Sequence, residues 1–335
     1  MEKLPLGKLQ PNLLEKILQK IPKLDSNVIL GPGTGLDCSV LDFGDQYLVF
    51  KSDPISLTSD NMGWYAVEIN TNDIVTTGAD PKWMLTTILL PEGSTSFSDV
   101  DRISDQLIDA STKYGITIIG GHTEITSGIS RPILSCTMIG IVEKEKLITP
   151  NRVRTGDLIF LTKEIAIETV SILANDFTNK LANVLSEKEI QIAKSYIKKP
   201  GISIYKEATL LRYGFGVTAM HDPTEGGLAS ALWEMAIASQ KEFEITFDAI
   251  PLSSLTKKIT DHFSLNPLNS ISSGALLFTA SPEYKEKIFT VMKENSIPIS
   301  LIGKVPKNGI GVYINEGNVR KELLRPERDD ITKIF

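Results

Sequence analysis

Hydrophobic positions along the first half of the chain alternate between a helical and an extended spacing, which predicts helices and strands in the same region. Apolar residues recur at helical spacing after Pro11, so the chain is expected to open with an amphipathic helix. Two β-rich runs, 38–43 and 46–52, flank Gly44-Asp45 and predict a hairpin. The other elements expected here are helices over 61–77 and from Ser96 or Ser98 to Gly115, and strands over 81–90, 116–119 and 133–142.

A polar stretch, residues 143–156, separates this half from a second set of alternating elements. The spacing predicts helices over 165–174, 187–197, 204–212, 227–239 and 283–294, and strands over 157–161, 217–220, 274–279, 299–305 and 311–314. Because strands and helices are mixed in both halves, the fold class is α/β (or α+β). At about 150 residues per domain, 335 residues suggest two domains, which we place at 1–148 and 149–335.

Composition narrows the class of protein. Apolar residues make up 41% and charged residues 23% of the chain, which is typical of a globular protein. The net charge of −6 argues against nucleic acid as the main ligand. With no long apolar run and no signal-peptide pattern, we expect a soluble cytoplasmic protein with no membrane partner. Cys38 and Cys136 have no framework spacing and are expected to be reduced core thiols, although a role for Cys38 beside Asp37 stays open.

Three aspartates lie where regular elements end or meet. Asp37 follows a glycine-rich run, Asp53 ends a predicted strand, and Asp73 lies in a predicted helix beside Asn72. Carboxylate oxygens are the ligands that Mg²⁺ prefers, so the three could hold such an ion. The alternative is that each caps a helix or solvates a turn.

Two glycine-rich segments could present backbone N–H groups to an anion. They are GPGTG, ending at Gly35, and GGHTE, which begins at Gly120 and is expected to be a loop after the strand 116–119. Neither has the spacing of a P-loop or of a dinucleotide-binding fingerprint, so each is a weak signal and could be an ordinary turn.

The segment VTAMHDPTEGGLASALWEMA gives the sharpest local signal. A strand leads into His221 and Asp222, and Gly226-Gly227 then opens a helix whose first N–H groups favour a phosphate. The alternative is that Thr224 is an ordinary N-cap and Asp222 a solvated turn residue. His122 and His221 both fall in these candidate loops, but no histidine spacing typical of zinc occurs.

Several strings resemble, in order, the aminoimidazole ribonucleotide (AIR) synthase superfamily. GPGTGLDCSVLD resembles its G-x-G-x-D motif, and the block from KSDP through NTNDI to GADP and ILLP resembles its second motif. GGHTE is similar to its G-G-x-T loop. HDPTEGGLASALWEMA and LTKEIAIETVSILA look like the hydrogenase maturation (HypE-like) branch.

The resemblance implies two α/β domains, a homodimer built through the N-terminal domains, and ATP with Mg²⁺ in a cleft between the two halves. It implies ATP-dependent transfer of the γ-phosphoryl group to an oxygen of an amide, carbonyl or similar small substrate. Carried over position by position, the metal ligands would be Asp37, Asp53 and Asp73, supported by Asn72. The catalytic residues would be Asp73, Asp222 and His122, and the nucleotide-binding residues Gly35, Gly120, Gly121, Thr123, Thr224, Gly226 and Gly227.

Two departures from the family pattern matter. Leu36 stands where the family usually has an acidic residue, which puts one metal ligand or one of two ions in doubt. HypE proteins carry a thiocarbamate on a C-terminal cysteine, whereas this chain has no Cys after Cys136. We therefore expect a free small molecule as the acceptor. The alternative is a catalytically silent nucleotide-binding scaffold that acts on a maturation partner protein.

Overall fold

A computed structural model describes Leu4, residues 6–56 and residues 61–335. These residues form two compact units. The N-terminal unit consists of Lys23–Gly31 and Asp37–Leu147. The C-terminal unit consists of Ile148–Phe335, joined by Pro32–Leu36 and by the segment that carries the first helix, α1 (Pro11–Leu18).

The N-terminal unit is built on a six-stranded sheet of order β1-β2-β3-β6-β4-β5. Neighbouring strands are antiparallel except β4 and β5, which are parallel and connected through a helix, as parallel strands must be. The strands are β1 (Val28–Leu30), β2 (Ser39–Phe43), β3 (Gln46–Ile55), β4 (Asp80–Pro91), β5 (Thr117–Thr126) and β6 (Ile133–Glu143).

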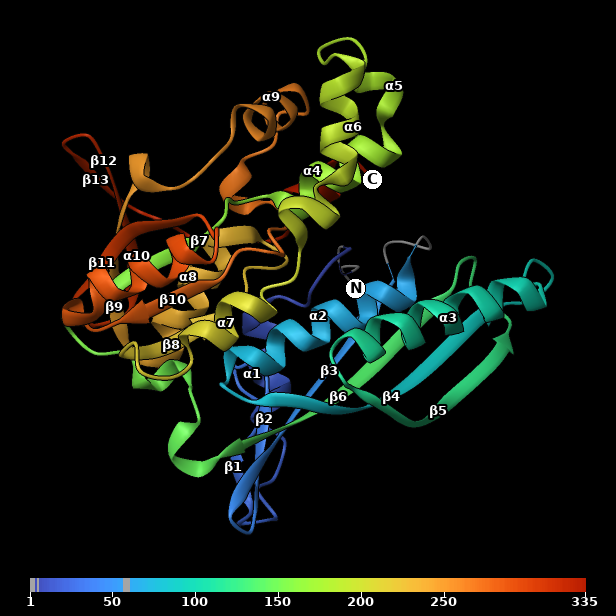
Figure 1. The fold of residues 1–335 in the computed structure, drawn as a ribbon, viewed down its shortest axis with the longest axis horizontal. Helices are drawn as coiled ribbons and strands as arrows, with labels where there is room; N and C mark the ends of the chain where they lie inside the picture. Colours follow the sequence, from blue (N-terminus) through green and yellow to red (C-terminus); the bar gives the residue numbers. More distant parts are fainter. Residues whose placement is uncertain (1–3, 5, 57–60) are drawn as a thin grey trace. The chain divides into compact units, whose positions relative to one another are not determined.

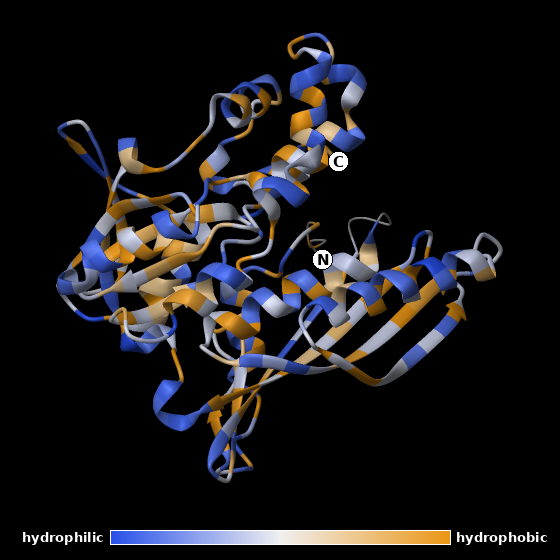
Figure 2. Ribbon diagram, viewed as in Figure 1, coloured by the Kyte–Doolittle hydropathy of each residue, from blue (hydrophilic) through white to orange (hydrophobic). Residues whose placement is uncertain are grey.

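Two helices, α2 (Met62–Thr76) and α3 (Phe97–Lys113), cover one face of this sheet (Figure 1). Helix α2 is buried almost throughout, because it lies between the sheet and α3. Helix α3 is amphipathic, and its ribbon in Figure 2 carries both hydrophobic and hydrophilic residues. A capping box at Ser96 fixes its start. Along β6, buried residues alternate with half-buried ones, so the second face of the sheet is much less covered.

The C-terminal unit is built on a seven-stranded sheet of order β13-β12-β9-β11-β7-β10-β8, antiparallel except for the pair β12 and β9. Its strands are β7 (Leu158–Thr162), β8 (Val217–His221), β9 (Lys241–Thr246), β10 (Leu277–Ala280), β11 (Ile299–Asn308), β12 (Gly311–Glu316) and β13 (Val319–Glu322). Its helices are α4 (Ile167–Asp176), α5 (Thr178–Leu181), α6 (Glu187–Ser195), α7 (Tyr205–Leu211), α8 (Gly227–Ser239), α9 (Ser254–His262) and α10 (Lys285–Glu294).

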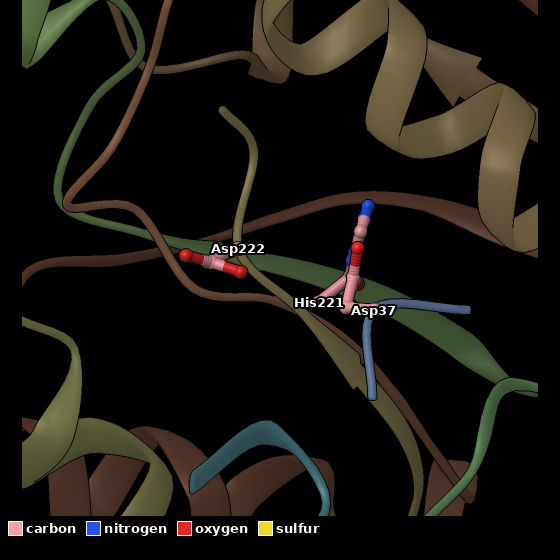
Figure 3. A group of neighbouring side chains, drawn as sticks. All are labelled: Asp37, His221 and Asp222. Carbon is pink, nitrogen blue, oxygen red and sulfur yellow. The ribbon is translucent and has the colours of Figure 1, made fainter. Parts of the chain in front are cut away.

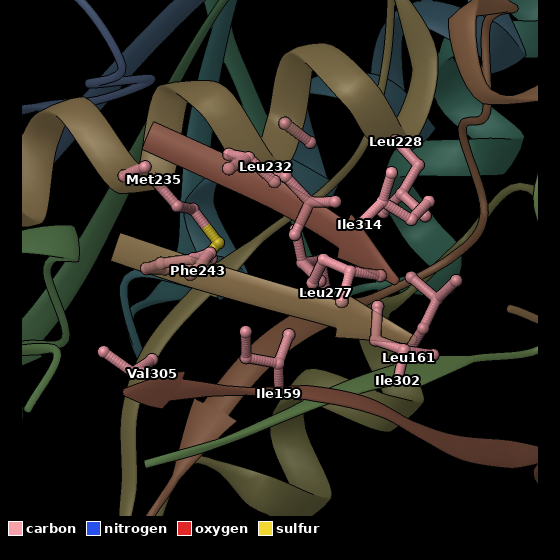
Figure 4. Close-up of a cluster of buried hydrophobic side chains, with 14 of the residues drawn as sticks. Ile159, Leu161, Leu228, Leu232, Met235, Phe243, Leu277, Ile302, Val305 and Ile314 are labelled. Carbon is pink, nitrogen blue, oxygen red and sulfur yellow. The ribbon is translucent and has the colours of Figure 1, made fainter. Parts of the chain in front are cut away.

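Both faces of this second sheet are buried. Ile159 and Leu161 of β7 belong to the cluster that packs against α8, which contributes Leu232 (Figure 4). Phe160, between them in sequence, points to the other face, where it stacks on Phe278 at 5.0 Å between ring centroids. Continuous apolar strands are therefore required here, and the pattern of a strand buried on both faces is what the sequence shows.

The predicted α/β class is confirmed, as are the hairpin around Gly44, helices α2 and α3, and α8 with the predicted bounds. The expectation of a loop at residues 120–124 is wrong, since these residues continue strand β5 to Thr126. Strands β1, β9 and β13 and helices α5 and α9 were not expected. Among the residues that the structure describes, no helix has the length and apolar character needed to cross a bilayer.

Candidate functional site

Two of the predicted metal ligands meet in the N-terminal unit. Asp53 comes from strand β3 and Asp73 from helix α2, which packs on that strand. The backbone N–H of Asp53 donates to Oδ1 of Asn70 at 3.1 Å, which fixes the end of β3 against α2. The ammonium of Lys51 lies 3.2 Å from Oδ2 of Asp53 and 3.3 Å from Oδ2 of Asp73.

Charge dominates the surroundings of Lys51. Burial lowers the pKa of this ammonium, but the negative charges of Asp73, Asp53 and Asp37 outweigh that effect and raise the pKa well above its usual value. Lys51 is therefore a permanent cation among three carboxylates. All three predicted metal ligands thus lie close enough to act on one positive charge within this unit.

The residues around Asp73 are tightly packed. Asn72 is fully buried beside it in α2. The thiol of Cys38 donates to the backbone carbonyl of Asp73 at 3.5 Å, so Cys38 packs against the same turn of the helix. Cys136 is buried too, and this burial, together with Asp53, raises the pKa of its thiol to about 12. Cys136 is a core thiol with no thiolate character, as expected.

The predicted residues on strand β5 lie apart from this packing. Gly120, Gly121, His122 and Thr123 are all exposed on the edge strand of the sheet. Nε2 of His122 is 3.1 Å from Oε2 of Glu124, two residues along the same strand. The β5 residues are accessible to a ligand or partner.

In the C-terminal unit, His221 and Asp222 end strand β8, and both are buried (Figure 3). Nε2 of His221 lies 3.1 Å from Oε2 of Glu234, which comes from α8. The backbone of Glu234 also approaches Gly35, where an added Cβ would lie 2.5 Å from its carbonyl oxygen. Since Gly35 also has a φ of +76°, only glycine fits there.

The loop between β8 and α8 is held by a carboxylate from the C-terminal segment. Gly226 and Gly227 both have positive φ, and Gly226 is the N-cap of α8. The N–H of Gly226 donates to Oδ2 of Asp329 at 2.6 Å, so a carboxylate already occupies the position that sequence reasoning gave to a phosphate. Thr224, predicted beside it, accepts a hydrogen bond from Lys8 at 3.3 Å.

Two buried acids of this unit were missed from the sequence. Burial raises the pKa of Asp329 to about 6, although the N–H groups of Gly226 and Ile331 stabilise its charge. Burial raises the pKa of Glu168 in α4 to about 7; Ser273 offsets part of the rise, while Asp329, Glu225 and Asp222 add to it. The C-terminal unit thus gathers four carboxyl groups around the loop that precedes α8.

The local signals for the missed residues differ in strength. Lys51 stands two residues before Asp53, so period-two alternation places both side chains on one face of β3. Glu168 is a charged residue inside an apolar helical repeat, which is a weaker signal. Asp329 has no local signal, because its role depends on contact with Gly226 across the unit.

Sequence comparison identifies the class of protein to which these two units belong. The sequence model of the AIR synthase related protein N-terminal domain matches residues 35–142, and that of the C-terminal domain matches residues 154–315. The chain therefore belongs to the AIR synthase related family.

Relatives cover nearly the whole chain. The chain is 27% identical to a putative hydrogenase expression/formation protein of Methanocaldococcus jannaschii, over 98% of this chain and 97% of that protein. It is 24% identical to a thiamine-monophosphate kinase of Haemophilus influenzae, over 88% of each chain. It is 26% identical to a carbamoyl dehydratase HypE of Rhizobium leguminosarum bv. viciae, over 78% of this chain and 75% of that protein.

Solved structures share the fold. The structure of HypE in complex with ATP aligns with a TM-score of 0.71 at 21% identity, over 94% of this chain and 90% of that chain. The HypE–HypF complex aligns with a TM-score of 0.74 at 19% identity, over 94% of this chain and 99% of that chain. At these identities the likeness establishes the two-domain fold.

Proposed function

We propose that this protein is an ATP- and Mg²⁺-dependent enzyme that phosphorylates an oxygen of an amide- or carbonyl-type small molecule. The observation that carries the proposal is the pair of Asp53 and the buried Asp73 around Lys51, with Asp37 near enough to act on the same charge. Among its relatives, one solved HypE binds ATP, and others are named a dehydratase and a kinase. These relatives support nucleotide chemistry on the shared fold.

The donor set fits magnesium. Asp37, Asp53 and Asp73 offer hard carboxylate oxygens, and these three would hold the ion, with Asn72 beside Asp73 in support, while Asn70 ties α2 to the backbone of β3. When bound, Mg²⁺ would neutralise phosphate charge during the transfer. Phosphoryl transfer depends mainly on positioning and charge stabilisation, so a rigid set of carboxylates is the part that this chain must supply.

The C-terminal unit would supply the remaining groups. In the proposed reaction, the bond between the γ-phosphorus and the ADP oxygen breaks as a bond to the acceptor oxygen forms. Asp222, a buried carboxylate on a loop stiffened by Pro223, would accept the proton that the acceptor loses. Gly35, Thr224, Gly226 and Gly227 are the proposed nucleotide-binding residues of this unit; the N–H groups of Gly226 and Gly227 already donate to Asp329 and Thr224, so these two glycines would line the phosphate path without donating to it. On strand β5, Gly120, Gly121 and Thr123 are the proposed nucleotide-binding residues and His122 the proposed catalytic residue.

A thermal-shift titration with Mg²⁺·ATP tests this proposal. Nucleotide at about 100 times Kd stabilises the protein by roughly 2.7 kcal/mol, a rise in Tm of about 5 °C for domains of this size. Asp73→Asn should keep the fold but lose most of this rise. Asp45→Asn, in the exposed turn between β2 and β3, is the matched control and should respond like the wild type.

Measurements of turnover distinguish an ATP-dependent enzyme from a nucleotide-binding scaffold. Phosphate or ADP release with amide and carboxamide substrates, lost in Asp73→Asn, supports the enzyme. ATP binding with no release across such a set of substrates would instead favour a nucleotide-binding scaffold that serves a maturation protein. Absence of any shift with ATP would contradict both. The HypE–HypF complex supports a protein partner as the alternative.

We also propose a homodimer built through the N-terminal unit. The face of its sheet opposite α2 and α3 carries Leu85, Leu89 and Ile139, none of which is fully buried. An apolar sheet face of this kind marks an interaction surface, and a second copy of the same face would cover it.

A further inference from the structure

Lys51 lies between two carboxylates of the N-terminal unit, that of Asp73, which is buried, and that of Asp53, which is 36% exposed. The side chain of Lys51 is 12% exposed and that of Asp73 only 4% exposed. Lys51 and Asp53 point to the same face of β3, and Asp73 reaches that face from α2. Both ion-pair distances, 3.2 and 3.3 Å, are to the Oδ2 atoms, so one ammonium bridges two carboxylates.

The charge count favours a single divalent ion beside this lysine. Three neighbouring carboxylates of like charge repel one another, and a cation among them offsets that repulsion. With Lys51 the set of Asp37, Asp53, Asp73 and Lys51 carries a formal charge of −2, which one Mg²⁺ neutralises. A second ion would leave the protein groups with an excess of positive charge.

A comparison within the chain shows that Lys51 is not an ordinary structural lysine. Lys163 of the C-terminal unit is equally buried, but it pairs with one carboxylate, Glu207, and also donates to the backbone carbonyls of Gly201 and Ser203. Those contacts crosslink the chain. Lys51 instead contacts two side-chain carboxylates that are themselves candidate metal ligands.

We propose that Lys51 is a built-in cation of the metal site, taking the place of one divalent ion between Asp53 and Asp73, so that the site binds one Mg²⁺ per chain. This inference rests on the proposed function for the identity of the site. It also accounts for Leu36. The family pattern has an additional acidic residue at this position, whereas this chain has fewer carboxylates and one lysine among them.

Titration with Mn²⁺ as a spectroscopic substitute for Mg²⁺ tests this inference without nucleotide or turnover. The wild type should bind one Mn²⁺ per chain by electron paramagnetic resonance. Lys51→Met should bind a second ion, or bind the first at least about tenfold more tightly, because a repelling charge is gone. Lys51→Arg keeps the charge and should resemble the wild type, as should Lys144→Met, whose lysine pairs with Asp42.

Thermal stability gives a second measurement, which stays informative if Lys51→Met folds poorly. Removing Lys51 takes a counterion away from the buried Asp73 and from Asp53, so metal-free Lys51→Met should have a lowered Tm. Saturating Mn²⁺ should raise that Tm more than it raises the Tm of the wild type. Equal increments, unchanged Mn²⁺ affinity and stoichiometry in Lys51→Met, or two ions in the wild type would overturn the inference.

Failure of the proposed function has a different signature. A protein that binds Mn²⁺ as described but shows no thermal shift with Mg²⁺·ATP keeps the role of Lys51 and loses nucleotide chemistry. A protein that shifts with ATP but binds Mn²⁺ equally in all variants keeps the proposed function and loses the role of Lys51.

Discussion

Glu168 is a single carboxyl group that should make stability depend on pH. Burial raises its pKa from 4.5 to about 7, so the native state binds this proton more tightly than the unfolded state does. The free energy of unfolding should therefore fall as pH rises from about 4.5 to 7, by about 3 kcal/mol for this group. Asp329, with a pKa of about 6, should add to the same trend.

Glu168→Gln removes this ionisation and keeps the shape. Relative to the wild type, the variant should gain about 3 kcal/mol in free energy of unfolding between pH 5 and pH 8, measured by urea denaturation. Glu187→Gln, on an exposed first-turn residue of α6, is the control and should keep the wild-type pH dependence. Parallel pH profiles for wild type and Glu168→Gln would show that Glu168 does not titrate in this range.

At the scale of single residues, only part of the candidate site could be predicted from the sequence. Asp53 and Asp73 could be predicted because carboxylates close to the boundaries of predicted elements are a recognisable pattern. The structure places both inside their elements, β3 and α2, and brings both to Lys51. Lys51 could have been found by strand alternation, which places the residue two positions before Asp53 on the same face of the strand. Asp329 could not, because its partner Gly226 lies 103 positions away in the chain.

At the scale of elements, the contact between α2 and α3 depends on one glycine. A Cβ on Gly63 would lie 2.6 Å from the carbonyl oxygen of Ile103 and 2.9 Å from Cβ of Gln106, both in α3. The N–H of Gly63 also donates to Oε1 of Gln106 at 3.1 Å. Close approach of the two helices therefore requires glycine at this position.

Gly63→Ala should lower the free energy of unfolding by about 1–3 kcal/mol, although alanine is the better helix former by about 1 kcal/mol. Urea denaturation measures the change. Gly31→Ala, where the nearest atom would lie at an ordinary 3.5 Å, is the control within the same unit and should change stability little. A Gly63→Ala protein more stable than the wild type would mean that the two helices can separate without loss.

The elements also show why local pattern succeeds or fails. Helix α8 was predicted with its bounds because a glycine pair precedes an uninterrupted apolar segment. A similar pair, Gly120-Gly121, was interpreted as a loop but lies within β5. There a Cβ on Gly121 would collide with the backbone of Thr86 in the neighbouring strand, so glycine serves strand packing. Strand β9 (KEFEIT) has charged residues at two of its first four positions, which weakens the apolar strand pattern; in the fold one of them, Glu242, pairs with Arg320 of β13.

At the scale of the whole molecule, the open face of the N-terminal sheet should decide the oligomeric state. Register places Trp83 opposite Ile139 and Leu89 opposite Ile133; between these apolar pairs Leu85 lies opposite Thr137 and Thr87 opposite Ser135, so the face combines apolar side chains with small polar ones. Its residues are half-buried or exposed within the chain, unlike their neighbours toward α2. Hydrophobic burial of Trp83, Leu85, Leu89, Ile133 and Ile139 against an identical face would stabilise a dimer.

Leu85→Asp should therefore convert the protein to a monomer, because a charge placed in the middle of an apolar interface is costly to desolvate. Light scattering at micromolar concentration gives the mass directly. Leu85 is 38% exposed, and Ile192 of α6 in the C-terminal unit is 42% exposed, so Ile192→Asp is a matched control that should remain dimeric. A wild type that is already monomeric would exclude this face as a dimer interface. If Leu85→Asp and Ile192→Asp both gave monomers, the loss of the dimer could not be assigned to the N-terminal sheet face.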